Sequence, residues 1–178
     1  MNNLVPGLKM DKWSDCNNFD FENWYRNDGH VCLTHVPVDV RCPPGYVLLH
    51  QNGVCYKFSN DKLSWNNASQ KCKDEDGELA SVTKRWIEMF LSENLVGDSY
   101  IGASKISKGK DWTWTDGKAW QQYEKKKVLE QSETSEGSNL YAVILDNGGN
   151  ESGWNVSSNG SEAKNYICQF DPNEGILK

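Results

Sequence analysis

Residues 42–170 carry a regular pattern of hydrophobic and polar positions, and the residues on either side of them do not. Residues 1–41 are rich in Asn and Asp, with scattered aromatic side chains and neither a helical nor a strand period. Four of the five prolines lie in or just after this first stretch. We therefore predict an N-terminal extension over residues 1–41, a folded domain over residues 42–170 and a C-terminal tail over residues 171–178.

The stretch SWNNASQKC, residues 64–72, has the spacing of an amphipathic helix. Ser64 is suited to cap the N-terminus of this helix, because its hydroxyl can accept a hydrogen bond from an early backbone amide. Gly77 is suited to end the helix. The face that we predict to be buried carries Trp65, Ala68, Ser69 and Cys72.

A second helix is predicted in TKRWIEMFLSENL, residues 83–95, with Thr83 as its N-terminal cap. Its apolar stripe is expected to face the core. The stripe consists of Trp86, Ile87, Phe90 and Leu91.

Short strands surround these helices. They are predicted over residues 54–59, 99–104, 111–116, 141–146 and 164–170. In the third of them, Trp112 and Trp114 alternate with polar residues, so both side chains are expected on the buried face. Residues 125–138 form the most polar run and are predicted to be a long loop. Two helices with several short strands indicate the α+β class.

The composition narrows the kinds of partner and site. The chain has 178 residues and a formal net charge of −6, which argues against nucleic acid or an anionic membrane as the main partner. No run of 18 apolar residues is present, so no membrane span is predicted. The start, MNNLVPGLKM, lacks the apolar stretch of a signal peptide. We expect either that the signal was removed or that the chain is an excised ectodomain.

The six cysteines indicate an oxidising compartment. They form an even set, and no CxxC spacing suggests a zinc site. We therefore expect three disulfides and an extracellular location, as a secreted protein or as the ectodomain of a membrane protein. Spacing alone leaves 15 possible pairings open. The cysteines are Cys16, Cys32, Cys42, Cys55, Cys72 and Cys168.

Seven short motifs occur in a characteristic order over residues 42–170: CPPGYVLLHQNGVCYKFS, SWNNASQKC, GELASV, YIGA, WTWTDG, GWN and NYICQF. In this order they resemble the C-type lectin-like domain in its long form. The resemblance implies a fold with two helices, short antiparallel sheets and a long loop region. It also implies the disulfides Cys42–Cys55 and Cys72–Cys168, which leaves Cys16 and Cys32 to pair with each other in the extension. In the alternative pairing, one of these two bonds to a partner chain.

The chain departs from the family's calcium-dependent sugar site. In the family that the chain resembles, this site consists of a loop tripeptide, in which a cis-proline stands between two oxygen-bearing residues, and of a later Trp-Asn-Asp motif. Here no proline lies between Trp114 and Tyr141, and the later motif ends in Val156 rather than Asp. Because calcium takes six to eight oxygen ligands, we infer that the ordinary calcium-dependent sugar activity is absent and expect no metal or cofactor. The remaining acidic candidates are expected to be solvated: Glu130, Glu133, Glu136 and Asp146.

The family's inner disulfide is also missing. Tyr141 stands where one of its cysteines would fall, and a residue near Asn159 stands where the other would fall. The loop between these two positions is therefore expected to be less constrained.

Four Asn-x-Ser sequons are candidate glycan acceptors. Three of them lie in the stretch NESGWNVSSNGS, in the region of the missing ligand and the missing cysteine. Our hypothesis is that this former ligand face has become a glycan-bearing surface and that recognition has moved elsewhere. The alternative is that such patterns arise by chance in a loop rich in Ser and Asn. The acceptors are Asn67, Asn150, Asn155 and Asn159.

The sequence favours recognition over catalysis. His50 is the only histidine in the patterned domain, and with the cysteines in bridges no Ser/His/Asp or Cys/His arrangement can be assembled, so we predict no enzyme. We predict an extracellular recognition or adhesion domain that binds a protein partner without calcium. One alternative is carbohydrate binding by tryptophan stacking, and another is a structural module of a larger extracellular protein. The candidate contacts are Trp120, Tyr123, Lys125, Lys126 and Lys127.

Overall fold

The computed structural model describes residues 41–106, 111–118, 120, 139–148 and 153–172. All of them belong to the unit that spans residues 39–178. Residues 1–40, with the predicted Cys16–Cys32 bond, and the predicted loop over residues 125–138 lie outside the described residues. The domain boundaries therefore stay a prediction.

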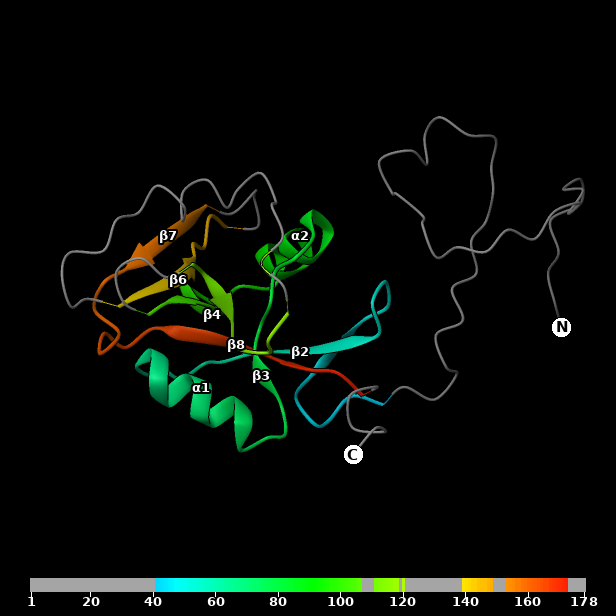
Figure 1. The fold of residues 1–178 in the computed structure, drawn as a ribbon. Coiled ribbons are helices and arrows are strands. Elements are labelled where there is room, and N and C mark those ends of the chain that lie inside the picture. Colours follow the sequence, from blue (N-terminus) through cyan, green and yellow to red (C-terminus); the bar gives the residue numbers. More distant parts are fainter. Residues whose placement is uncertain (1–40, 107–110, 119, 121–138, 149–152, 173–178) are drawn as a thin grey trace, which may run out of the picture. The chain divides into compact units, whose positions relative to one another are not determined.

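The described residues form two helices and eight strands (Figure 1). The helices are α1 (Trp65–Lys73) and α2 (Arg85–Glu93). The strands are β1 (Val47–Leu49), β2 (Val54–Phe58), β3 (Glu78–Leu79), β4 (Ser99–Lys105), β5 (Thr113–Trp114), β6 (Leu140–Ile144), β7 (Trp154–Ser157) and β8 (Asn165–Phe170).

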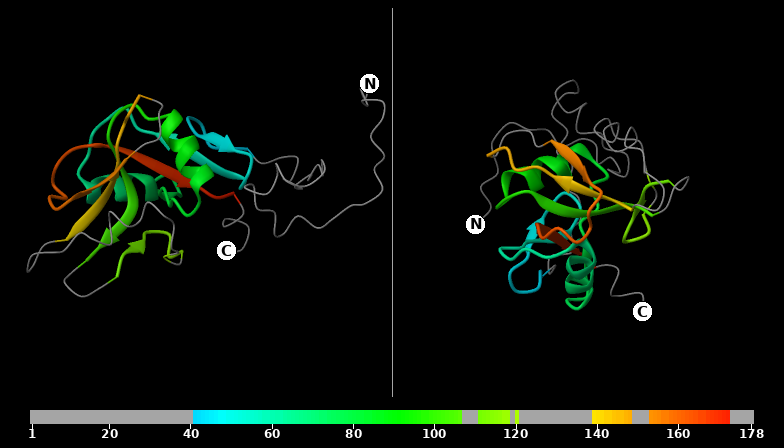
Figure 2. Two further views of the ribbon diagram at one scale, coloured as in Figure 1. Left: turned by 90° about the horizontal axis from the view of Figure 1, so that it is seen from above. Right: turned by 90° about the vertical axis from the view of Figure 1, so that its left-hand side faces the viewer.

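The strands make one sheet in the order β1-β2-β8-β4-β6-β7, with β3 paired to β8 and β5 paired to β4. Only the pair of β4 and β8 is parallel among these described strands. Figures 1 and 2 show α1 and α2 on opposite sides of this sheet. Each helix covers its own buried cluster: Ile87 and Leu91 of α2 belong to one, and Trp65 and Cys72 of α1 belong to the other. The predicted α+β class is confirmed.

Helix α1 begins and packs as predicted but ends earlier. The Ser64 Oγ accepts a hydrogen bond from the Asn67 backbone amide, and the four residues expected on the buried face are buried. Gly77 does not end the helix: α1 stops at Lys73, and Asp76 takes the left-handed conformation with φ 58°. Gly77 instead lets the chain pass close to β8, because a Cβ on residue 77 would lie 2.5 Å from the Gln169 carbonyl oxygen.

Helix α2 begins at Arg85, so the prediction that Thr83 caps it is wrong. Lys84 occupies the capping position and its side chain makes no capping hydrogen bond. The apolar stripe does face the core. Phe90 is partly buried, and its ring centre lies 5.8 Å from that of Tyr56 and 6.2 Å from that of Phe58 on β2. This aromatic contact fixes α2 against the sheet.

Three strands were not predicted: β1, β3 and β7. Each has only two to four residues, which is too short for the period of two to be recognised in the sequence. The predicted strand over residues 111–116 shrinks to Thr113–Trp114, although Trp112 and Trp114 are both buried as expected.

Two disulfides join distant parts of the domain, and they are the pairs that the family resemblance implies. Cys42 bonds to Cys55 on β2. Cys72 on α1 bonds to Cys168 on β8, across a sequence separation of 96 residues. In the chain-entropy model, closing a loop of this length stabilises the fold by about 4.7 kcal/mol.

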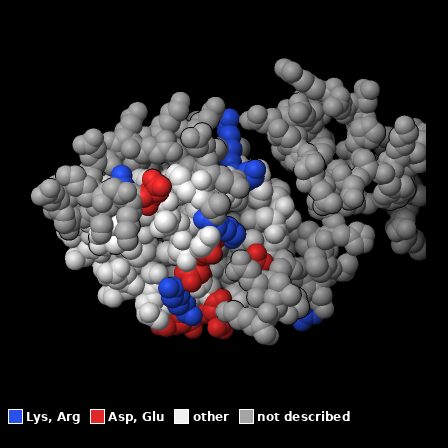
Figure 3. Space-filling model, viewed as in Figure 1, with Lys and Arg blue, Asp and Glu red and all other residues white. Residues whose placement is uncertain are grey.

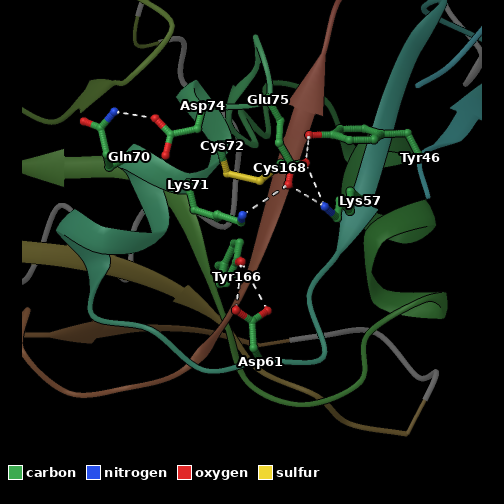
Figure 4. A network of polar contacts seen from close by, with 10 residues as sticks. All are labelled: Tyr46, Lys57, Asp61, Gln70, Lys71, Cys72, Asp74, Glu75, Tyr166 and Cys168. Carbon is green, nitrogen blue, oxygen red and sulfur yellow. Dashed lines mark hydrogen bonds and ion pairs between the residues drawn. A yellow bond between two sulfur atoms is a disulfide. The ribbon is translucent and has the colours of Figure 1, made fainter. Parts of the chain in front are cut away.

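A polar network beside the Cys72–Cys168 bond ties the end of α1 to the hairpin of β1 and β2 (Figure 4). The Lys57 Nζ donates to both carboxylate oxygens of Glu75 at 2.7 Å, and the Tyr46 hydroxyl donates to Oε2 of the same carboxylate at 3.0 Å. The hydrogen bond from Lys57 holds the pKa of the Glu75 carboxyl below its usual range. Nearby, the Tyr166 hydroxyl donates to Asp61.

The Tyr141 ring, at a position where the family resemblance implies a cysteine, packs against Trp65 and Gly160. Its centre is 4.9 Å from that of Trp65, and a Cβ on Gly160 would fall 2.4 Å from the Tyr141 Cε2. The Trp65 backbone amide also donates to the Gly160 carbonyl at 2.9 Å. Tyr141 and Gly160 are thus in contact through packing. The expectation of a less constrained loop between positions 141 and 159 stays a prediction, because residues 149–152 lie outside the described residues.

We predict that Gly160→Ala destabilises the domain by about 1–3 kcal/mol, because the added methyl group overlaps the buried Tyr141 ring. Thermal or urea unfolding monitored by tryptophan fluorescence measures the change. In a Tyr141→Ala background the same substitution should cost less than about 0.5 kcal/mol, because the ring is gone. An equal cost in both backgrounds would contradict the packing argument.

Candidate functional site

Strands β4, β5, β6 and β7 carry every internal segment that lies outside the described residues. Residues 107–110 connect β4 to β5, residues 119 and 121–138 lie between β5 and β6, and residues 149–152 lie between β6 and β7. Connections between strands are the usual place for binding residues on a rigid scaffold. We call these four strands the loop-bearing strands and take them as the base of the candidate site.

Four tryptophans form a cluster on and beside the loop-bearing strands. The centre of the Trp120 ring lies 6.0 Å from that of Trp112 and 5.2 Å from that of Trp114. Trp154 on β7 meets Trp114 edge-on, with ring centres 6.4 Å apart and an interplanar angle of 82°. Trp112, Trp114 and Trp154 are buried, and Trp120 is half-buried against them. The cluster therefore fixes the point at which the chain enters residues 121–138.

Only one of the predicted contact residues is described. Trp120 packs on the core through part of its surface, so a partner could reach only the rest of its ring. Tyr123, Lys125, Lys126 and Lys127 lie outside the described residues.

Asp116 anchors the turn that follows β5. Its side chain is only 2% exposed, and Lys118 Nζ lies 2.8 Å from its Oδ2. The Gln169 Nε2 on β8 donates to the same oxygen at 2.7 Å, and the Gln169 Oε1 accepts from the Ser81 backbone amide at 2.8 Å. Asp116 and Gln169 thus hold the loop-bearing strands against the middle of the sheet. No local sequence pattern predicts this bond, which joins residues 53 positions apart.

Two opposing effects set the pKa of Asp116. Burial raises the pKa of this carboxyl, and the hydrogen bonds and positive charge of Lys118 outweigh burial and leave the pKa below its ordinary value. The carboxylate therefore stabilises the folded state in its charged form.

Among the described residues on and beside β7, the side chains do not fit a calcium ion. Asn155 is exposed, but its Oδ1 accepts a hydrogen bond from the Val156 amide at 2.8 Å, and the Val156 side chain, which packs against the core, contains no oxygen. The Asp146 Oδ1 accepts from the Gly148 amide at 2.9 Å. Calcium takes six to eight oxygens, and the Oδ1 atoms of Asn155 and Asp146 are already engaged in hydrogen bonds. Glu130, Glu133 and Glu136 lie outside the described residues.

Within the described ranges, no group of three or more His, Cys, Asp or Glu side chains is arranged to hold a metal ion. Lysines and carboxylates lie intermixed on the described part of the face in Figure 3, so that face does not carry a patch of one charge.

Three of the four sequon asparagines are described, and all three are exposed. Asn67 lies on α1, Asn155 on β7, and Asn159 in the turn that follows β7. Asn150 lies outside the described residues.

A polar hollow of about 390 Å³ was not indicated by the sequence. It lies where three turns meet: the turn after β2, the turn before β4 and the turn before β8. The buried Asn165 lines it, with Lys62, Asp98, Glu162 and Lys164. Its residues come from three separate stretches that share no sequence pattern, and so only the folded chain reveals the hollow.

The chain matches the Lectin C-type domain family over residues 61–170. A relative, C-type lectin lectoxin-Phi1 of Philodryas olfersii, is 27% identical over 151 residues, which cover 78% of this chain and 89% of the relative.

Two solved structures share the fold. The C-type carbohydrate-recognition domain of cow CD23 is 24% identical, covers 73% of this chain and 95% of its own, and superposes with a TM-score of 0.61. A calcium-independent type II antifreeze protein is 20% identical, covers 74% of this chain and 95% of its own, and superposes with a TM-score of 0.56. The predicted C-type lectin-like fold is confirmed.

We predict that Asp116→Asn lowers the free energy of unfolding at pH 7 by about 1–3 kcal/mol, because it removes a charge-assisted hydrogen bond to Lys118. A carboxyl with a lowered folded-state pKa stabilises the fold above its unfolded-state pKa of about 3.9 and loses that contribution as the pH falls further. The difference between wild type and Asp116→Asn should therefore shrink below about pH 4.

Urea unfolding between acidic and neutral pH measures this difference. Glu162→Gln is the matched control, because it removes a carboxylate that pairs with Lys164 at 2.7 Å but is 51% exposed. Its effect should stay within about 0.5 kcal/mol. A difference between wild type and Asp116→Asn that does not change with pH would contradict the assignment.

Proposed function

Since this chain belongs to the C-type lectin domain family, we propose that it is an extracellular recognition domain that binds a protein partner without calcium. Domains of this family bind carbohydrates or proteins, and the fold is typical of binding domains rather than of enzymes. Along the described parts of the chain, neither helix has the length and apolar character needed to cross a bilayer. The two disulfides support an oxidising, extracellular location.

The observation that carries the proposal is the set of side chains on β7. Valine at 156 and the Asn155 amide, already bonded to the Val156 N–H, leave too few free oxygens for a calcium ion. Recognition then depends on the shape and side chains of the loops. A protein of this fold described as a calcium-independent type II antifreeze protein supports the idea that the fold needs no ion.

The tryptophan cluster supports a binding surface beside it. Two buried rings, those of Trp112 and Trp114, hold the half-buried Trp120 at the start of residues 121–138. This segment contains Tyr123 and three consecutive lysines. Aromatic and cationic side chains are common among the residues that dominate protein interfaces, although arginine is the more usual cation. The partner surface is therefore proposed to be acidic, facing Lys125, Lys126 and Lys127.

A second candidate function is carbohydrate binding without metal. It is favoured by one observation, the half-buried Trp120 ring, whose exposed part could stack on a sugar. An array of glycans beside an array of cell-surface ectodomains, each probed with calcium and with chelator, separates the two functions. Glycan signal that survives chelation and is lost in Trp120→Ala would replace protein binding as the conclusion. The absence of a binding signal on both arrays would favour a role as a structural module of a larger extracellular protein.

We predict that calcium leaves the stability of the domain unchanged. A ligand at fifty times its Kd stabilises the folded state by about 2.3 kcal/mol, which raises the Tm by several degrees. The Tm in millimolar calcium should therefore match the Tm in chelator within about 1 °C. A concentration-dependent rise in Tm with calcium, absent with magnesium, would contradict calcium independence.

We predict that replacing Lys125, Lys126 and Lys127 together by alanine weakens partner binding at least about tenfold, because it removes the charges that attract an acidic surface. Surface plasmon resonance against the ectodomain identified on the array measures the loss. Lys71→Ala with Lys73→Ala is the matched control, since it removes two exposed positive charges on α1. Equal losses in both variants would indicate general charge attraction and overturn the proposed surface.

A further inference from the structure

Strand β7 forms one edge of the sheet. It pairs with β6 along one side, and no other described strand pairs with its second side. An edge strand presents backbone N–H and C=O groups that can pair with a strand from another chain. Proteins that remain monomeric protect such edges.

The register of the two strands shows which groups of β7 face outward. The Leu145 amide donates to the Gly153 carbonyl at 2.8 Å, so residues 145 and 153 form a hydrogen-bonded pair. Bonded and non-bonded pairs alternate along an antiparallel ladder. Val143 and Asn155 therefore form the next bonded pair, and the backbone groups of Trp154 and Val156 point away from β6.

The Asn155 side chain already occupies part of this edge. Its Oδ1 accepts the outward N–H of Val156 at 2.8 Å, and the residue is exposed. This bond holds the side-chain amide at the edge of the sheet, where a second strand would have to approach. The same amide is the acceptor of the sequon Asn155-Val156-Ser157.

We propose that Asn155 carries an N-linked glycan and that this glycan covers the β7 edge, preventing it from pairing with a second copy of the chain. In the modification, Nδ2 forms a bond to the anomeric carbon of a lipid-linked oligosaccharide. The bond from that carbon to the lipid diphosphate breaks, its electron pair leaves with the diphosphate, and Nδ2 gives up one proton. The proposal does not depend on the identity of the binding partner.

The surroundings of Ser157 determine whether the glycan is added before or after the domain folds. Its hydroxyl is buried, donates to the Asn159 carbonyl at 3.1 Å and accepts from the Asn159 amide at 3.3 Å. The sequon hydroxyl is therefore enclosed once β7 has folded, and transfer to Asn155 must precede folding. Asn159 differs, because both it and Ser161 are exposed in the folded domain. Its Oδ1 accepts from the Ser161 amide at 3.1 Å.

The first test is a peptide map of the full chain secreted from cultured animal cells behind an added signal peptide. Glycosidase treatment in heavy-oxygen water converts each glycosylated asparagine to a labelled aspartate. We expect the label at residue 155. An unlabelled Asn155 in secreted, disulfide-bonded protein would overturn the proposal.

The second test measures association by size exclusion with light scattering over a range of concentrations. The glycosylated chain should remain monomeric over this range. Asn155→Gln should dimerise, with a dimer dissociation constant at least about tenfold lower than that of the glycosylated chain. Asn67→Gln is the matched control, because it removes an exposed acceptor on α1, away from the edge. It should leave the chain monomeric.

The unmodified natural sequence gives a third arm that contains no substitution. The chain produced in the bacterial periplasm forms disulfides and receives no glycan of this type. It should associate as Asn155→Gln does, which keeps the test valid if that variant folds poorly. Monomeric behaviour of both forms at all concentrations, or equal association of Asn67→Gln, would overturn the role of the glycan at the β7 edge.

Discussion

The bond between Cys72 and Cys168 fixes α1 to the strand on which most of the sheet depends. Strand β8 pairs with β2, β3 and β4, and so it joins the hairpin at one end of the sheet to the loop-bearing strands at the other. The residue after Cys168 extends this role: Gln169 bonds both to Asp116 and to the Ser81 backbone. One covalent bond and one buried amide thus place the candidate site relative to the rest of the domain.

Local signals in the sequence were sufficient for the start and buried face of α1 and for the burial of Trp112 and Trp114, because each depends on neighbours within one turn or one strand. They were insufficient for the starting residue of α2, where an extended Lys84 replaces the expected cap, and for β7, which has four residues. Gly77 shows a different limit. Its lack of a side chain is required by Gln169 on a strand more than ninety positions later, a contact that no local pattern encodes.

Some features of the candidate site can likewise be predicted from the sequence, and others require the folded chain. The absence of a ligand at position 156 and the sequons can be read directly from the sequence, because each is a short pattern with a chemical meaning. The arrangement of Trp114, Trp120 and Trp154 into one cluster requires β4, β5, β6 and β7 to be assembled first. The packing of Tyr141 on Gly160 likewise appears only in three dimensions, since a ring and a glycine share no recognisable spacing.

The two disulfides also determine how the domain would respond to a mechanical load. Tension applied to the chain before Cys42 crosses directly to Cys55 through sulfur, so β1 bears none of it. From Cys55 the load follows the backbone to Cys72 and crosses to Cys168, where it leaves through the last residues. Residues 73–167, which include all of the loop-bearing strands, lie in a covalent side loop. Pulling on the two ends therefore cannot extend the recognition surface until the Cys72–Cys168 bond is broken.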